Sequence, residues 1–287
     1  MGSGTVAHDT VIAVVSRRSF IAGSAGLGLV ACSGSGGGSA NAAQVLVSFF
    51  ADGNQGPGQQ RLAFGIADSS GKIVTTGPEK LTGRILDVNG KVVVPSVVAP
   101  RRGVGLPRPY WAFEMQLAEP GTYTLEVGKA TAAFTVSDPA RLAIPRAGQP
   151  LPAIDTPTIA DPRGVNPICT ANPICPLHTI TLTEALALGK PIALLVGTPA
   201  HCKTAVCGPV LTFLIEDQAR LAGKVTVLHA EVYKDDTIND ITDTMLALKL
   251  KYEPVLFVTD ATGTIVSRLD NVWDVAEQRA ALAKVAG

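Results

Sequence analysis

Two pairs of cysteines are the residues of this sequence whose type and spacing could do chemistry. Cys202 and Cys207 lie in "GTPAHCKTAVCGP", and Cys169 and Cys175 lie in "NPICTANPICPLH". Cysteines so close in sequence can form a structural disulfide, exchange disulfides with other thiols, or bind a metal ion. Which of these chemistries applies depends on the redox state of the compartment in which the protein works.

The first residues have the features of an export signal. The stretch "SRRSFI" at 16–21 resembles the twin-arginine export consensus, and a weakly apolar run follows over 21–31. That run is too short to cross a hydrocarbon core of about 30 Å as a helix. "LVAC", which ends at Cys32, resembles a lipobox, the cleavage site of bacterial lipoproteins. We therefore expect a signal peptide over 1–31, a lipid on Cys32 and a flexible Gly/Ser tether over 32–43.

This expectation places the protein in the cell envelope, anchored to the outer face of the cytoplasmic membrane. Of the five cysteines, four then remain besides Cys32. An even number of cysteines in an exported protein favours disulfides, although the sequence alone does not choose among the possible pairings. The 24 basic residues are balanced by 24 acidic residues and form no basic run, so we expect no nucleic-acid partner.

For Cys169 and Cys175 we predict a structural disulfide that closes a small loop. The repeated "NPIC" suggests two similar turns that present the thiols. Two alternatives are redox exchange with the other cysteine pair and a zinc site that includes His178. No second cysteine–histidine pair lies nearby in the sequence, so we predict neither a metal nor another cofactor.

The elements that must position these cysteines fall into two different parts. Residues 44–138 alternate between apolar and polar side chains with period two, which is typical of half-buried strands. The apolar members of the runs are Val45, Val47 and Phe49; Leu62, Phe64 and Ile66; Trp111, Phe113, Met115 and Leu117; and Tyr123, Leu125 and Val127. Turns such as "DVNGK" separate the runs, and the pattern resembles an immunoglobulin-like β-sandwich.

Residues 139–176 form a proline-rich segment between the two parts. Nine of the 20 prolines fall in this stretch. Proline fixes φ and removes an amide donor, so the segment cannot be a helix or a central strand. We predict an extended linker that lies partly on the surface of a domain.

From residue 177 onward, predicted helices and strands alternate. A capping box at Thr181 and Glu184 starts a short helix that stops at Gly189. The other predicted elements follow in chain order: the buried strand "PIALLVGT", a helix over 203–222, the buried strand "VTVLHAEVY", helical spacing over 238–248, a hairpin of "PVLFVTD" and "TIVSRL", and a helix over 273–286. The predicted order is β-α-β-α-β-β-α.

This order over 177–287 resembles the thioredoxin fold. Cys202 follows the first buried strand where a helix begins, Pro209 lies seven positions later, and Glu253-Pro254 precedes the hairpin as the family's cis-proline does. The resemblance implies thiol–disulfide exchange with envelope proteins. In that chemistry Cys202 would be the nucleophile, Cys207 the resolving thiol, and Pro254 the residue that presents its backbone to the substrate, close to the Cys202 sulfur.

The spacing of the pair departs from that family, which uses C-x-x-C. In a regular helix, residues five apart point in different directions, and their Cα atoms lie beyond the roughly 7 Å that a disulfide can span. Either the helix begins only at Gly208-Pro209, or its first turn unwinds on oxidation.

Three other functions compete with exchange. "TPAHCKTAVCG" is similar to the motif of bacterioferritin-comigratory peroxiredoxins, but that family's threonine position holds Pro199, with Thr198 displaced by one. Copper delivery would need a distal histidine near the cysteines, and His229 is expected in a strand core. The third alternative is a binding lipoprotein whose disulfides are purely structural. It would need neither the peroxiredoxin motif nor a distal histidine. We favour exchange through Cys202 and Cys207.

Overall fold

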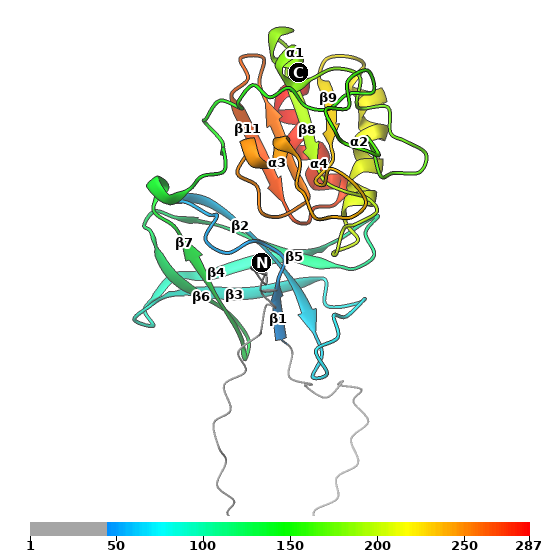
Figure 1. Ribbon diagram of the computed structural model, residues 1–287. Coiled ribbons are helices and arrows are strands. Elements are labelled where there is room, and N and C mark those ends of the chain that lie inside the picture. Colours follow the sequence, from blue (N-terminus) through cyan, green and yellow to red (C-terminus); the bar gives the residue numbers. More distant parts are fainter. Residues whose placement is uncertain (1–44) are drawn as a thin grey trace, which may run out of the picture. The chain divides into compact units, whose positions relative to one another are not determined.

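Seven antiparallel strands from the first part of the chain form one sheet. The computed structural model of the chain describes residues 45–287, so the predicted signal peptide, tether and lipidated Cys32 lie outside the described residues. The strands are β1 (Val45–Ser48), β2 (Gly58–Ala67), β3 (Lys80–Asp87), β4 (Val92–Arg102), β5 (Tyr110–Leu117), β6 (Gly121–Val127) and β7 (Ala130–Val136). Their order across the sheet is β1-β2-β5-β4-β3-β6-β7 (Figure 1).

This sheet replaces the two packed sheets of the predicted sandwich. Its seven strands are hydrogen-bonded in one continuous series, and the edge strands β1 and β7 contact each other, so the sheet nearly closes into a barrel. The prediction that residues 44–138 are built from strands is therefore confirmed over the described residues. An immunoglobulin-like arrangement of those strands is not shown.

The predicted apolar faces of these strands are confirmed except in β1. Trp111 and Phe113 of β5 are fully buried, as is Phe64 of β2. In β1, however, Val45 is 52% exposed and Leu46 is buried. The reason is the register, which pairs Leu46 with Ile66 and so places both side chains on the inner face.

The second part of the chain contains a four-stranded sheet of order β11-β10-β8-β9 (Figure 1). Strands β8 and β9 are parallel, whereas β10 is antiparallel to both β8 and β11. The strands are β8 (Ile192–Val196), β9 (Thr226–Ala230), β10 (Val255–Thr259) and β11 (Ile265–Asp270). The α-helices are α1 (Leu182–Ala187), α2 (Cys207–Leu221), α3 (Asp243–Ala247) and α4 (Val275–Ala286). None of the helices within 45–287 has the length and apolarity needed to cross a bilayer.

Both faces of this second sheet are covered, as its continuous apolar strands predict. Ala193 and Leu195 of β8 pack into a core that includes residues of α2 and α4. Their neighbours Leu194 and Val196 point the other way, into a core shared with α1 and α3. The central strand β8 therefore ends between two rigid layers, and the loop that carries Cys202 leaves from that end.

Helix boundaries follow local capping and turn chemistry. The Thr181–Glu184 capping box at α1 is confirmed, with both reciprocal hydrogen bonds present. The helix predicted over 203–222 begins only at Cys207, because a turn at Ala205, which has a φ of 57°, precedes it. The helical spacing over 238–248 yields only α3, because Thr242 caps that short helix and Ile238 has a φ of 55°.

The proline-rich segment packs against the second sheet instead of spanning open space. After a short 3₁₀ helix at Pro139–Arg141, the backbone of Gln149 and Leu151 bonds to that of Ile265 and Gly263. Leu151 is buried in the core that lies over β8 and β10. The later part of the segment is attached as well, because the amide of Asn166 donates to the carbonyl of Lys234.

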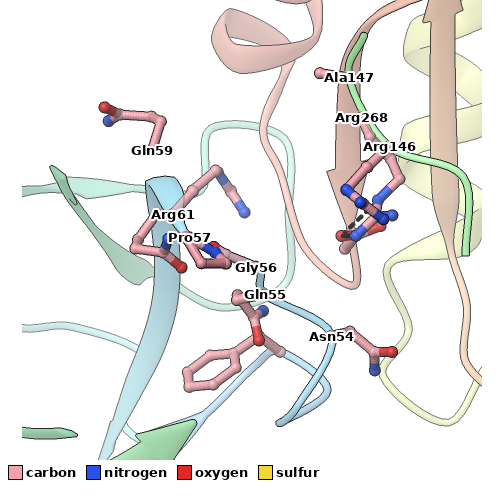
Figure 2. Close-up of a pocket in the computed structure, with 12 residues that line it drawn as sticks. Asn54, Gln55, Gly56, Pro57, Gln59, Arg61, Arg146, Ala147 and Arg268 are labelled. Atoms are coloured by element: carbon pink, nitrogen blue, oxygen red, sulfur yellow. Dashed lines mark hydrogen bonds and ion pairs between the residues drawn. The ribbon is translucent and has the colours of Figure 1, made fainter. Parts of the chain in front are cut away.

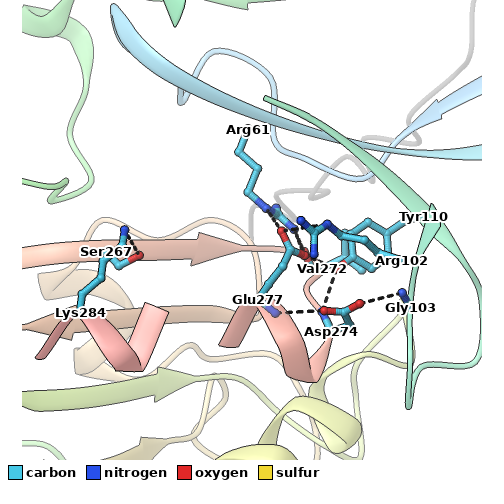
Figure 3. Close-up of polar contacts among 9 residues, drawn as sticks. All are labelled: Arg61, Arg102, Gly103, Tyr110, Ser267, Val272, Asp274, Glu277 and Lys284. Atoms are coloured by element: carbon cyan, nitrogen blue, oxygen red, sulfur yellow. Dashed lines mark hydrogen bonds and ion pairs between the residues drawn. The ribbon is translucent and has the colours of Figure 1, made fainter. Parts of the chain in front are cut away.

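A buried polar cluster joins β2 and β5 to α4 (Figure 3). Arg61 donates two hydrogen bonds of 2.7 Å to the two carboxylate oxygens of Glu277, and Tyr110 donates to the same carboxylate. The amide of Asp274 donates to the Tyr110 hydroxyl at 2.8 Å, and its carboxylate accepts from the amide of Gly103 at 3.1 Å. Residues 45–287 accordingly belong to one compact unit.

Candidate functional site

Cys202 and Cys207 form a disulfide at the start of α2. Their Cα atoms are 6.0 Å apart, within the usual range for a disulfide. Of the two geometries open at the sequence level, the structure has the late helix start, because α2 begins at Cys207 and residues 202–206 form a loop. The five-residue spacing is therefore compatible with a bond.

The two cysteines differ in access to solvent. Cys202 is partly exposed, whereas Cys207 is only 1% exposed. The backbone amide of Cys207 donates to the Cys202 sulfur at 3.2 Å. An amide donor and the positive end of the α2 dipole both stabilise a thiolate at Cys202 once the bond is reduced.

Pro254 lies beside this pair, on the side of Cys207. The bond between Glu253 and Pro254 is cis. A Cβ atom added to Gly197 would lie 3.4 Å from the Pro254 Cβ and 3.8 Å from the Cys207 sulfur. Pro254 and Cys207 therefore approach each other across the bare backbone of Gly197, and the position of Pro254 relative to the Cys202 sulfur stays a prediction.

Glu253 is the residue of this site that sequence reasoning did not assign a role. Its carboxylate accepts from the amide of Thr198 at 2.7 Å and lies 3.5 Å from the Cys207 sulfur. Burial raises the pKa of the Glu253 carboxyl to about 7, against the opposing hydrogen bond from Thr198. The sequence signal was a charged residue one position before Pro254, which directly precedes a continuous apolar strand.

A buried carboxylate, that of Glu231, connects the loop before Cys202 to residues 166–178. Glu231 is 3% exposed and accepts from the amide and hydroxyl of Thr170 at 2.6 and 2.9 Å. The Thr170 hydroxyl also accepts from the amide of Ala200 at 3.1 Å and contacts that of Thr198 at 3.2 Å. Thr170 thereby fixes the loop that precedes Cys202.

Cys169 and Cys175 do not form the predicted disulfide in the structure. Both thiols are free and buried, and with His178 and His229 they form what we call the thiol–imidazole cluster. One side-chain nitrogen or sulfur atom from each residue lies within 4.8 Å of the other three. His229 is buried in β9 as expected, but it faces these thiols and not the 202–207 pair.

A groove adjoins the loop of residues 202–206. It has a volume of about 290 Å³ and is lined on one side by Lys203, Thr204 and Val206. The opposite side is lined by Phe49 and Leu106 of the first part of the chain. Its apolar wall lies within reach of a polypeptide that approaches Cys202.

A larger cavity of about 350 Å³ lies elsewhere, lined by Arg61, Arg146 and Arg268 (Figure 2). Arg146 and Arg268 lie next to each other, and Arg61 lies across from them. Arg61 is paired with Glu277 and Arg268 with Asp270, so two of the three charges are already compensated. The one carboxylate in its lining, Asp270, is paired with Arg268, and we assign the cavity no chemistry.

Comparison with protein-family models finds no match for this chain, and comparison with curated proteins finds none either.

Proposed function

We propose that the protein exchanges disulfides with envelope proteins through Cys202 and Cys207. The observation that carries the proposal is the asymmetry of the pair. A partly exposed cysteine at a helix N-terminus is bonded to a buried cysteine, whose sulfur lies 3.5 Å from the carboxylate of Glu253. A purely structural disulfide needs no such proton acceptor.

A thioredoxin-like domain over 177–287 is part of this proposal. Two features support it: the chain order of the elements, and the pairing of parallel β8 and β9 with the antiparallel hairpin β10–β11. The positions of Cys202 after β8 and of Pro254 before β10 support it as well. A lipid anchor at Cys32 and an envelope location are proposed from the sequence motifs alone.

In the reducing direction, the thiolate of Cys202 attacks one sulfur of a substrate disulfide. A new bond forms between Cys202 and that sulfur, the substrate's S–S bond breaks, and its second sulfur leaves as a thiolate. Cys202 is the sulfur that solvent reaches, and the Cys207 amide stabilises its anion.

In the second step Cys207 resolves the mixed disulfide. Its thiol gives its proton to the Glu253 carboxylate, and the Cys207 thiolate then attacks the Cys202 sulfur. The bond between Cys202 and the substrate breaks, and the leaving substrate thiolate takes the proton from Glu253. Two electrons pass from the cysteine pair to the substrate, so a second dithiol must reduce the pair again; the reverse sequence oxidises a substrate dithiol.

The test follows each thiol of the full-length protein after mild reduction. We expect Cys202 to be alkylated faster and at lower pH than Cys207, and Cys207→Ser to accumulate a mixed disulfide that Cys202→Ser does not form. The resolution rate should rise as Glu253 ionises near pH 7, where burial sets its pKa at about 7, and this rise should vanish in Glu253→Gln.

Glu114→Gln is the matched control, since it removes an exposed carboxylate on β5. If mild reductants leave the pair oxidised, or if both thiols react equally slowly, the pair is a staple and the protein is a binding lipoprotein. Rapid peroxide consumption that requires Cys202 would instead favour the peroxiredoxin alternative.

A further inference from the structure

We propose that the thiol–imidazole cluster of Cys169, Cys175, His178 and His229 is a closed structural site for one Zn²⁺ ion. All four residues are buried, with exposed fractions of 1–2%. Their donor atoms, two sulfurs and two imidazole nitrogens, converge on one point. Two thiolates with two imidazoles are a ligand set that tetrahedral zinc prefers.

The distances between donor atoms match the edges of a zinc tetrahedron. Bonds of about 2.3 Å to sulfur and about 2.05 Å to nitrogen give sulfur–nitrogen edges of about 3.6 Å and a nitrogen–nitrogen edge of about 3.3 Å. Nδ1 of His229 lies 3.4 Å from the Cys175 sulfur, 3.8 Å from the Cys169 sulfur and 3.1 Å from Nε2 of His178. These separations leave room for one ion at the centre.

The hydrogen bond on the far side of His229 determines which nitrogen faces the cluster as a lone pair. Nε2 of His229 donates to the carbonyl oxygen of Gly197 at 2.9 Å. In the neutral imidazole this donation leaves Nδ1 without a proton, and Nδ1 points toward the sulfurs and His178. A remote N–H held by a backbone carbonyl is the usual support of a zinc-bound histidine.

Charge balance is compatible with a divalent ion in this buried position. Zn²⁺ with two thiolates and two neutral imidazoles has no net charge, so a buried site carries little desolvation penalty. A disulfide between Cys169 and Cys175 would remove both thiolates, and the two imidazole nitrogens that face the cluster would then contact only each other, at 3.1 Å.

The scaffold holds the ligands together before any ion binds. The amide of His229 donates to the carbonyl of Leu177 at 3.1 Å, and the amide of Asn166 donates to that of Lys234 at 2.8 Å. These bonds attach the loop of Cys169 and Cys175 to β9, which carries His229, and to the chain that follows β9. With four protein ligands no position is open to substrate, so the role is structural.

The experiment measures metal in the full-length protein, purified under reducing conditions without added metal. We expect one zinc per chain by elemental analysis, and replacement with Co²⁺ should give the visible absorption of tetrahedral cobalt with a sulfur-to-cobalt charge-transfer band. Cys175→Ser and His229→Gln should each weaken zinc binding by more than roughly 100-fold, beyond the typical loss for a supporting residue.

Two further measurements keep the test decisive if those variants fail to fold. In the wild-type protein, Cys169 and Cys175 should resist alkylation until a chelator removes the zinc. The control variant, Cys202→Ser combined with Cys207→Ser, should keep its zinc, which separates this site from the proposed exchange activity. A Cys169–Cys175 disulfide without zinc, binding of Cu⁺ in preference to zinc when both are supplied, or loss of zinc in the control variant would overturn the proposal.

Discussion

Replacing Glu253 with glutamine should stabilise the folded protein at alkaline pH and have little effect at acid pH. The carboxyl is buried next to Cys207, which raises its pKa to about 7 from an ordinary value of 4.5. Below pH 4.5 both the folded and the unfolded chain hold this proton. Between these two values the unfolded chain releases the proton and the folded chain keeps it, so stability falls as the pH rises.

The size of the effect follows from the width of that interval. A shift from 4.5 to about 7 corresponds to roughly 3 kcal/mol of lost stability above pH 7, at about 1.4 kcal/mol per pH unit. The side chain is partly exposed, and glutamine gives up the charged hydrogen bond with Thr198. We therefore expect a net gain of about 1–2 kcal/mol for Glu253→Gln at pH 8.

Urea denaturation of the oxidised protein at pH 4 and pH 8 measures this difference. Glu114→Gln, on the exposed side of β5, reports the background effect of removing a surface carboxylate. The reasoning fails if the difference in unfolding free energy between wild type and Glu253→Gln is the same at both pH values, because the carboxyl would then titrate alike in both states.

Two other changes test the buried ion pair between β2 and α4 and the proposed lipid anchor at Cys32. Arg61→Ala removes two charged hydrogen bonds from the buried Glu277 carboxylate, which keeps the Tyr110 hydroxyl and Arg102 at 3.8 Å, and should cost about 2–3 kcal/mol of unfolding free energy. Arg84→Ala, which breaks the more exposed pair with Glu126, should cost less than about 1 kcal/mol. Equal losses in the two variants, measured by thermal or urea denaturation, would contradict the buried-pair argument. Cys32→Ala should release the protein from membranes or block its processing; unchanged fractionation and mass of the processed chain would remove the lipoprotein proposal.

The buried face of a strand could be predicted from the sequence where the strand is long enough for its apolar and polar residues to alternate clearly. Phe113, Met115 and Leu117 of β5 alternate with the exposed polar residues Glu114 and Gln116, and all three are buried as predicted. The short strand β1 offers too few residues for alternation to decide its face. There the pairing of Leu46 with Ile66, a long-range choice, determines which side chains are buried.

The two candidate sites were predictable to different degrees for the same reason. The pairing of Cys202 with Cys207 could be inferred from the local sequence, because it requires only that α2 begin after Cys202. The full thiol–imidazole cluster could not: the sequence offered Cys169, Cys175 and His178 only as an alternative zinc site. His229 is 60 residues from Cys169 and reaches it because the backbone of residues 166–178 bonds to β9. Sequence spacing near Cys169 contains no trace of that contact.

Gly197 lies between the Cys202–Cys207 pair and the thiol–imidazole cluster and contacts both. Its carbonyl oxygen accepts from His229, its amide donates to Ala230, and its bare Cα faces Cys207 and Pro254. Both sites thus contact the same residue. Any effect of one site on the equilibrium at the other must therefore be reciprocal. Any factor by which an ion in the cluster shifts the equilibrium between disulfide and dithiol is the factor by which reduction shifts the affinity for that ion. A redox titration at two metal concentrations and a metal titration at two redox potentials would therefore yield the same number.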